Sequence, residues 1–360
     1  MKREEIGKMN RKVAFGEKQV YTLDNTYADI VEGPVGDHVK MLIGTLMFNN
    51  ESILSLIPGN AHDKTWREIA ETVRTPWDMP FDSQEIVDAA NLSIEIFDEN
   101  KWEIRSLWKE GQEVLFDNTK SGVCLFTPVM RPEEKRPGVI ICPGGAYVTL
   151  AMVNEGFGVA NRFYEHGYRP YILRYRRLPN LFPAQQEDLT LALLHVFANA
   201  ERDGVKADDL MIAGFSAGGH LCSSTVTMID TMKERVLTEL EKDARVECYR
   251  KICPMPQKMT LGYAVTEADS SLMGKLCPDR DKRDEYASYR HVSSGMPKTY
   301  AWACEDDRLV PVRNTVEWAE AMQRAGNPCL LHIYPTGGHG IACGYGTSAE
   351  GWMDEMFEYM

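Results

Sequence analysis

Ten residues, IAGFSAGGHL at positions 212–221, constrain the fold more than any other stretch of the chain. Ser216 stands between Gly214 and Gly218, and a third glycine follows at position 219. Each glycine costs about 1 kcal/mol relative to alanine inside a helix, so selection for a helix alone would avoid this composition. The pattern instead predicts a sharp turn between a strand and a helix. The glycines leave room for the flanking elements, and the Ser216 hydroxyl projects from the turn.

Segments typical of strands and of helices alternate around this turn. The strands that we expect lie at 101–108, 112–118, 122–128, 137–142, 169–175, 209–214, 259–265, 298–304 and 329–335. The helices that we expect lie at 154–164, 187–201, from 219 onward, and 314–325. Such alternation predicts an α/β fold, with a mostly parallel central sheet covered by helices on both faces. Ligands of such sheets bind beyond the carboxyl ends of the strands, so the chemistry is expected there.

The first hundred residues differ from the rest of the chain. Apolar residues recur at three- and four-residue spacing in 37–48 and 64–73, which predicts short amphipathic helices. A chain of 360 residues is long enough for a large domain with an appendage. We therefore divide it into a mainly helical extension, 1–100, and an α/β domain, 101–360. The extension is interpreted as a cap or dimerisation element, and a sharper hypothesis is that it narrows a substrate pocket.

Charge and composition exclude several classes of function. The formal net charge of −13 argues against nucleic acid or anionic lipid as a partner. The first thirty residues hold no apolar core of a signal peptide, and no stretch approaches the roughly 20 apolar residues that cross a bilayer. The nine cysteines lack the paired spacing of metal ligands, which favours free thiols in a cytoplasmic protein without a structural zinc site.

A serine hydroxyl is a weak nucleophile and needs a base. Three histidines follow Ser216 at a distance along the chain. His332 alternates within an expected strand and is interpreted as structural, whereas His291 lies in a polar loop with no strand before it. His339 follows the last strand on a glycine-rich loop, which can carry an imidazole over the edge of the sheet. His339 is therefore the expected base.

The acid that orients this histidine should follow the strand at 298–304. Three carboxylates occur there, Glu305, Asp306 and Asp307. A buried carboxylate at this place would hold the imidazole in the productive tautomer and stabilise its charged form. We choose Asp307, with Asp306 as the second choice.

An oxyanion needs backbone N–H groups aimed at its charge. The glycine pair in ICPGGAYVTLA follows the strand at 137–142, so Gly145 and Ala146 can supply two such groups. Ala217, directly after the serine, can supply a third.

Together these residues resemble the α/β-hydrolase superfamily. Within it the chain is similar to the acetyl esterase and xylan esterase-like group, which is related to hormone-sensitive-lipase-type carboxylesterases. The resemblance covers about 137–360 and rests on ICPGGAY, NEGFGVANRFYEHGYRPYILRYR, GFSAGGHL, SSLMGKL, WACEDDRLVPVRNT and LLHIYPTGGHG. It implies a Ser216–Asp307–His339 triad, where Asp307 begins the D-x-x-V-P segment, and no metal or organic cofactor.

The resemblance implies a serine esterase that removes short acyl groups, in the first place acetyl, from a carbohydrate or related alcohol. Two alternatives stay open: an amide hydrolase with the same triad, such as a formamidase or small peptidase, and a non-catalytic scaffold. The expected partner is a small-molecule ester, with a homodimer as a further option. Residues 1–100 match nothing in the resemblance, and 228–256 is longer than the resemblance leads us to expect. Both segments are therefore candidates for shaping the substrate pocket.

Overall fold

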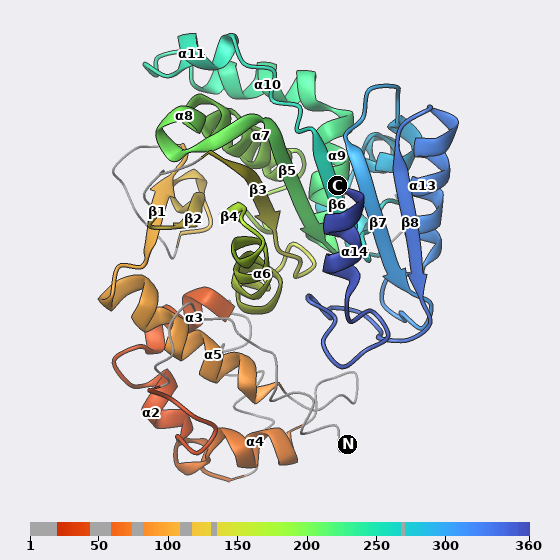
Figure 1. Cartoon of the computed structure of the whole chain (residues 1–360). Helices are drawn as coiled ribbons and strands as arrows, with labels where there is room; N and C mark the ends of the chain where they lie inside the picture. The colour runs from red at the N-terminus through yellow and green to blue at the C-terminus, as the bar shows by residue number, and fades with distance from the viewer. Residues whose placement is uncertain (1–19, 44–58, 74–81, 109–116, 131–134, 268–270) are drawn as a thin grey trace.

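A mostly parallel sheet organises the molecule (Figure 1). The computed structural model describes residues 20–43, 59–73, 82–108, 117–130, 135–267 and 271–360. Within these residues the sheet has eight strands in the order β1-β2-β4-β3-β5-β6-β7-β8. The strands are β1 (Trp102–Ser106), β2 (Cys124–Pro128), β3 (Arg136–Cys142), β4 (Arg169–Arg174), β5 (Val205–Phe215), β6 (Lys258–Gly262), β7 (Lys298–Cys304) and β8 (Cys329–Tyr334). β2 pairs antiparallel with β1 and β4, and every other neighbouring pair is parallel.

Continuous apolar runs explain the parallel part of the sheet. The last five residues of β3 and the last six of β5 are buried, and Ile141 of β3 pairs with Ala213 of β5. A strand buried on both faces does not alternate in polarity, which is why these segments read as unbroken apolar runs. The expected strands after residue 120 are confirmed within a few residues, whereas most of the strand expected at 112–118 lies outside the described residues.

Helices cover both faces of the sheet (Figure 1). One face carries α6 (Val159–Glu165) and α14 (Trp352–Tyr359), joined by the rings of Phe163 and Phe357. The other face carries α7 (Ala184–Ala198), α9 (Ala217–Thr227), α10 (Ile229–Glu239) and α13 (Arg313–Arg324). The remaining elements of this region are η5 (Lys120–Gly122), η6 (Met152–Gly158), α8 (Ala200–Asp203), α11 (Val246–Arg250), α12 (Ser271–Leu276), η7 (Arg280–Tyr286) and η8 (Ser288–His291).

The N-terminal region is helical, as expected. It comprises α2 (Tyr27–Val31), α3 (Gly36–Ile43), η3 (Ala61–Asp63), α4 (Trp66–Thr72), α5 (Ser83–Ser93) and η4 (Ile94–Asp98). These elements lie near the end of the molecule to which the carboxyl ends of the parallel strands point (Figure 1). α3 and α5 contact η6, and the buried apolar side chains of both regions form one continuous core. Of the large apolar residues Trp66, Trp77 and Phe81 in this region, Trp66 is fully buried, and the other two lie outside the described residues.

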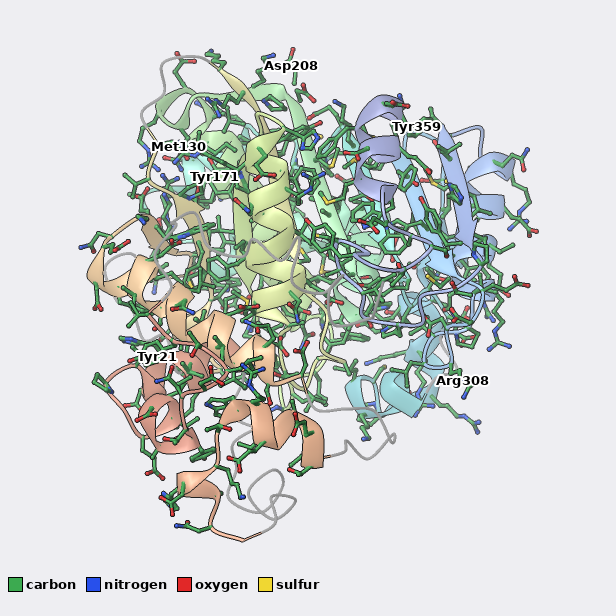
Figure 2. The ribbon with its side chains drawn as sticks, turned by 60° about the horizontal axis from the view of Figure 1, so that its bottom comes forward. Tyr21, Met130, Tyr171, Asp208, Arg308 and Tyr359 are labelled. Atoms are coloured by element: carbon green, nitrogen blue, oxygen red, sulfur yellow. The ribbon has the colours of Figure 1, made fainter. Side chains whose placement is uncertain are left out.

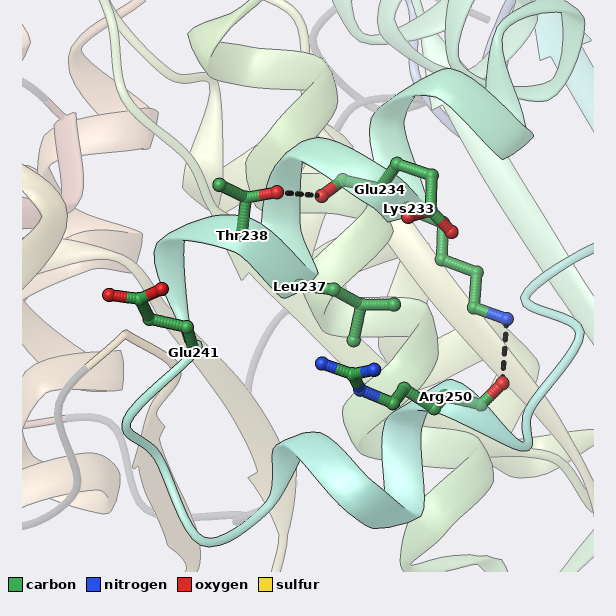
Figure 3. Close-up of a pocket in the computed structure, with 6 residues that line it drawn as sticks. All are labelled: Lys233, Glu234, Leu237, Thr238, Glu241 and Arg250. Atoms are coloured by element: carbon green, nitrogen blue, oxygen red, sulfur yellow. Dashed lines mark hydrogen bonds between the residues drawn. The ribbon is translucent and has the colours of Figure 1, made fainter.

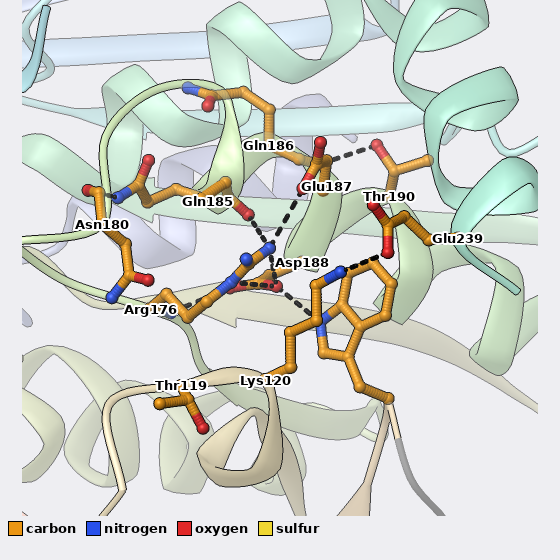
Figure 4. Close-up of polar contacts among 12 residues, drawn as sticks. Thr119, Lys120, Arg176, Asn180, Gln185, Gln186, Glu187, Asp188, Thr190 and Glu239 are labelled. Carbon is orange, nitrogen blue, oxygen red and sulfur yellow. Dashed lines mark hydrogen bonds and ion pairs between the residues drawn. The ribbon is translucent and has the colours of Figure 1, made fainter.

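A buried ionic network fixes the antiparallel side of the sheet to its covering helix (Figure 4). Arg176, just after β4, contacts Asp188 and Glu187 of α7, and Trp108 Nε1 donates to Asp188 at 2.7 Å. Asp188 is fully buried. Breaking a buried pair on one side costs about 3–5 kcal/mol, so this network is a structural element of the fold.

All nine cysteines lie in the described part of the chain, and all are free thiols.

Among the helices that the structure describes, none combines the length and apolar character that a membrane span requires.

Candidate active site

Ser216 occupies the turn between β5 and α9, at φ 52° and ψ −119°. Residues other than glycine rarely adopt such angles, and the cost is about 1–3 kcal/mol. The neighbouring glycines explain how the turn fits. A Cβ atom on Gly214 would lie 2.4 Å from the Gly218 carbonyl oxygen, and one on Gly218 would lie 2.0 Å from the Cys142 carbonyl oxygen. Close approach of β3, β5 and α9 therefore requires glycine at both positions.

The turn lies at the carboxyl end of β5 but is not open to solvent. Ser216 is only 9% exposed, so its hydroxyl projects into the site more than into water. Figure 2 separates the two ends of the sheet: Asp208, near the start of β5, is at the top of the view, and Arg308, next to Asp307, is toward the bottom. Tyr21 of the N-terminal region also lies in the lower half of that view.

The structure brings Ser216, His339 and Asp307 together. His339 Nε2 lies 2.8 Å from Ser216 Oγ, and His339 Nδ1 lies 2.7 Å from Asp307 Oδ2. The carboxylate can only accept, so Nδ1–H donates to Asp307 and Nε2 is left to accept the serine proton. The Asp307 side chain is fully buried, and its other oxygen accepts from the Leu309 and Val310 N–H groups. These bonds fix the carboxylate against the imidazole.

The three candidate acids have different positions. Asp306 is exposed, and its Oδ1 accepts from the backbone N–H groups of Gly337 and Gly338 at 2.9 and 2.8 Å. Asp306 thus holds the backbone of the loop that carries His339, which we call the 335–346 loop. Glu305 is exposed. Of the three, Asp307 alone has its carboxylate hydrogen-bonded to the imidazole.

The other downstream histidines contact different partners. His332 Nδ1 is 2.6 Å from Glu355, and its ring stacks on Tyr334. His291 Nε2 contacts the Asp284 carbonyl oxygen at 2.7 Å. Both distances place these imidazoles in other hydrogen-bonded pairs, which agrees with the interpretation of His332 as structural.

The 143–150 loop lies against the serine turn. A Cβ atom on Gly144 would lie 2.9 Å from Ser216 Cβ. The next three residues all have positive φ: 119° at Gly145, 55° at Ala146 and 55° at Tyr147. Among the hydrogen bonds of the described residues, none uses the N–H of Gly145 or Ala146. The N–H of Ala217 begins α9 and has no acceptor within the helix.

His220 of α9, which was not predicted from the sequence as a site residue, supports this loop. Its Nδ1 accepts from the Tyr147 hydroxyl at 2.8 Å, and its Nε2 donates to the Tyr286 carbonyl oxygen at 2.8 Å. Burial lowers the pKa of His220 to about 4, and the bond to Tyr286 opposes this shift. The imidazole is therefore neutral at pH 7 and holds Tyr147 in place. Its position one helical turn after Ser216 is the only signal in the sequence.

A buried acid beside the loop was likewise not predicted from the sequence. Glu155 of η6 is 4% exposed and accepts from the Gly144 N–H at 2.6 Å. Its other oxygen accepts from the Tyr263 hydroxyl at 2.8 Å. The Glu155 side chain thus touches the same loop that faces Ser216.

One surface pocket has no link to this site. A surface pocket between α10 and α11 is lined by six residues, and most of them carry charge (Figure 3): Lys233, Glu234, Leu237, Thr238, Glu241 and Arg250. Both helices pack against α7, at the end of the sheet away from Ser216, so the expectation that 228–256 shapes a pocket at the serine is wrong for them. Within the described ranges, no group of three His, Cys, Asp or Glu side chains could hold a metal ion.

The strand order, the strained serine between β5 and α9, and the serine–histidine–aspartate contacts define the α/β-hydrolase fold. The family model BD-FAE matches residues 125–322, more than half of the chain. The chain belongs to this family of hormone-sensitive-lipase-like α/β-hydrolases. This confirms the family that the sequence motifs predicted.

The chain is also similar to individual proteins whose names describe an activity. The chain is 28% identical over 272 residues to endo-1,4-beta-xylanase B of Butyrivibrio fibrisolvens, covering 72% of this chain and 40% of that protein. It is 29% identical over 236 residues to an acetylxylan esterase of Xylanibacter ruminicola, covering 65% and 46%. The chain therefore spans less than half the length of these curated relatives. A solved acetyl ester-xyloside bifunctional hydrolase from Caldicellulosiruptor lactoaceticus is 27% identical, with a TM-score of 0.61, covering 71% of this chain and 95% of that one.

Proposed function

We propose that the protein is a serine carboxylesterase that hydrolyses short-chain acyl esters, in the first place acetyl esters of a carbohydrate. The observation that carries this proposal is the unbroken hydrogen-bonded series from Asp307 through His339 to Ser216. An imidazole between a buried carboxylate and a serine hydroxyl is the arrangement that turns serine into a nucleophile. The names of the relatives, an acetylxylan esterase and an acetyl ester-xyloside hydrolase, support acetyl and sugar as the two halves of the ester.

The proposed reaction has two steps. Ser216 Oγ attacks the ester carbonyl carbon while His339 Nε2 takes the hydroxyl proton. The tetrahedral intermediate collapses when His339 returns that proton to the departing alcohol oxygen, which leaves an acyl-serine. Water then loses a proton to the same nitrogen and attacks the acyl carbon. His339 returns this proton to Ser216 Oγ as the bond between Oγ and the acyl carbon breaks, which releases the acid and the free serine. Asp307 stabilises the positively charged imidazole in both steps.

The oxyanion site of the proposal is formed by three backbone N–H groups. Gly145 and Ala146 belong to a left-handed segment beside Ser216, and their N–H groups have no partner among the described residues. Ala217 adds the first N–H of α9, where the helix dipole also favours negative charge. Donors of this kind lower the barrier by about 3–4 kcal/mol each, because the charge develops only in the transition state.

The experiment measures hydrolysis of p-nitrophenyl acetate, butyrate and octanoate by the full chain, followed by acetylated xylo-oligosaccharides, formamides and short peptides. We expect the highest kcat/KM for acetate and release of acetate from the sugar. A fluorophosphonate probe should label Ser216, as read by peptide mass spectrometry. Faster turnover of the amides would assign an amide hydrolase, and neither turnover nor labelling would indicate a scaffold.

A further inference from the structure

A buried acid connects the two loops that meet at Ser216. Glu155 lies on η6, and its two carboxylate oxygens have separate partners. One accepts from the Gly144 N–H at 2.6 Å, so it holds the 143–150 loop. The other accepts from the Tyr263 hydroxyl at 2.8 Å. A buried side chain whose two carboxylate oxygens both accept short hydrogen bonds is fixed in one position.

Tyr263 carries the connection to the histidine. Its hydroxyl oxygen accepts from the Ala342 N–H at 2.9 Å, three residues beyond His339 in the 335–346 loop. Its ring meets the His339 ring edge to face, with centroids 4.8 Å apart. Tyr263 has a φ of 37°, which is costly for an aromatic residue and places the ring between β6 and the histidine. Glu155 and Tyr263 therefore link both loops by three consecutive hydrogen bonds.

The hydrogen-bond directions favour the charged form of Glu155. Both of its partners donate: the Gly144 N–H can only donate, and the Tyr263 hydroxyl donates to the carboxylate while its oxygen accepts from the Ala342 N–H. Burial raises the pKa of Glu155, whereas the bonds from Tyr263 and Gly144 and the charge of His339 act against burial. Tyr263, His339 and Tyr175 are the titratable groups of the described residues that interact with this carboxylate.

We propose that Glu155 is an anionic positioning residue, which acts through Tyr263 to set the spacing of the 143–150 and 335–346 loops and stabilises the protonated His339. The inference rests on the proposed function, because protonated His339 forms only if Ser216 is activated. A buried negative charge favours a nearby cation strongly at low dielectric, and that cation exists only during the reaction. Glu155 therefore contributes to kcat more than to substrate binding.

Glu155→Gln separates charge from shape. The glutamine oxygen can still accept from Gly144, and its amide can donate to the Tyr263 oxygen, so the 143–150 loop keeps its contact while the charge is lost. With p-nitrophenyl acetate we expect kcat to fall about tenfold, with KM within about twofold. The acid limb of the kcat/KM profile should move to lower pH, because the anion that favours the imidazolium is gone.

Tyr263→Phe tests the second half of the connection, since it keeps the ring but removes the hydroxyl. We expect a smaller fall in kcat, and a double variant no slower than Glu155→Gln alone, because residues that act as a unit are not additive. Glu355→Gln is the matched control. Glu355 also accepts from two tyrosine hydroxyls, of Tyr300 and Tyr334, but it lies beside His332. This control should leave kcat and the acid limb unchanged.

Thermal unfolding of each variant shows whether it is folded. If Glu155→Gln is insoluble, the test uses Tyr263→Phe, and the measurement is the rate at which the fluorophosphonate labels Ser216 in that variant and in the wild type. The inference is overturned if Glu155→Gln retains kcat within twofold with an unmoved acid limb, or if the folded variants lose only thermal stability. A wild type that neither hydrolyses esters nor reacts with the probe would instead overturn the proposed function.

Discussion

The sheet region and the N-terminal helical region are built by different kinds of contact. In the sheet region the site side chains are held by hydrogen bonds from distant segments, such as Glu155 with Tyr263 and Asp307 with His339. In the N-terminal region the polar contacts stay mostly within the region, as in the capping boxes at Thr26 and Thr65 and the bonds of Asn91 with Val20 and Tyr21. Apolar burial joins this region to the sheet region.

Among the described residues, one hydrogen bond links the N-terminal region to the 143–150 loop beside the serine. Thr149 Oγ1 donates to the Ile43 carbonyl oxygen at 3.0 Å, from the 143–150 loop to the end of α3. From this contact we expect a division of roles, in which the sheet region fixes the chemistry and the N-terminal region influences substrate fit. The predictions below test this division.

The largest effect is expected for Ser216→Ala. Removal of the nucleophile should lower kcat by about 10⁴-fold or more, because only the oxyanion site and binding would remain. The side chain is small and faces the site, so thermal stability should change little. Ester turnover and fluorophosphonate labelling are the measurements, with the exposed Ser294→Ala as control. Labelling of another residue, or retained turnover, would contradict the assignment.

Asp307→Asn should lower kcat by about 10³–10⁴-fold, because the neutral amide favours the wrong imidazole tautomer. The adjacent Asp306→Asn is a matched control, since an amide oxygen can still accept from Gly337 and Gly338. It should cost about tenfold or less. Steady-state kinetics on one ester compares the two, and the reverse ranking would move the acid to position 306.

Acid should unfold the sheet region through two buried histidines. Burial lowers the pKa of His220 and of His195 to about 4 each. The unfolded chain binds these protons near pH 6.5, so the associated stability is complete above that pH and is lost as pH falls toward 4. Each group contributes about 3 kcal/mol at most. Urea unfolding at pH 7 and 4.5 measures the loss, and His220→Gln should reduce the difference between the two pH values. An equal pH dependence in variant and wild type would exclude His220.

The smallest effect is expected at the contact between the two regions. Thr149→Val removes the hydrogen bond to Ile43 with little change of shape. We expect KM or acyl-length preference to change about threefold, with kcat retained. This variant is cleaner than deletion of residues 1–95, because the apolar core continues across both regions. The series acetate, butyrate and octanoate is the measurement. A change in kcat alone would place Thr149 in the chemistry instead.

The sequence predicted most of the sheet region because its signals are local. Apolar runs marked β3, β5 and β7, and the glycines around Ser216 marked the turn. Asp307 could be chosen because its strand and loop preceded the histidine loop in the order that the resemblance requires. Each of these inferences used residues close together in the chain, or an order of segments.

The missed residues have partners far away along the chain. Glu155 bonds to Tyr263 across 108 positions, and His220 to Tyr147 across 73. Nothing in the neighbouring sequence marks either residue, so its partner becomes visible only when the strands are assembled. The packing of the N-terminal helices was equally inaccessible, because amphipathic periodicity shows which face is buried but not what covers it.

The glycines of the site also determine how freely its sequence can vary. Gly214 and Gly218 are closed to every other residue, because a Cβ atom would meet a carbonyl oxygen at 2.4 or 2.0 Å. Gly338 and Gly340 have positive φ but open space around them, so asparagine can occupy either with modest strain. Saturation libraries of this protein should thus return a single residue type at the turn and several at the histidine loop. Laboratory evolution of new substrates has its freedom beside His339, not beside Ser216.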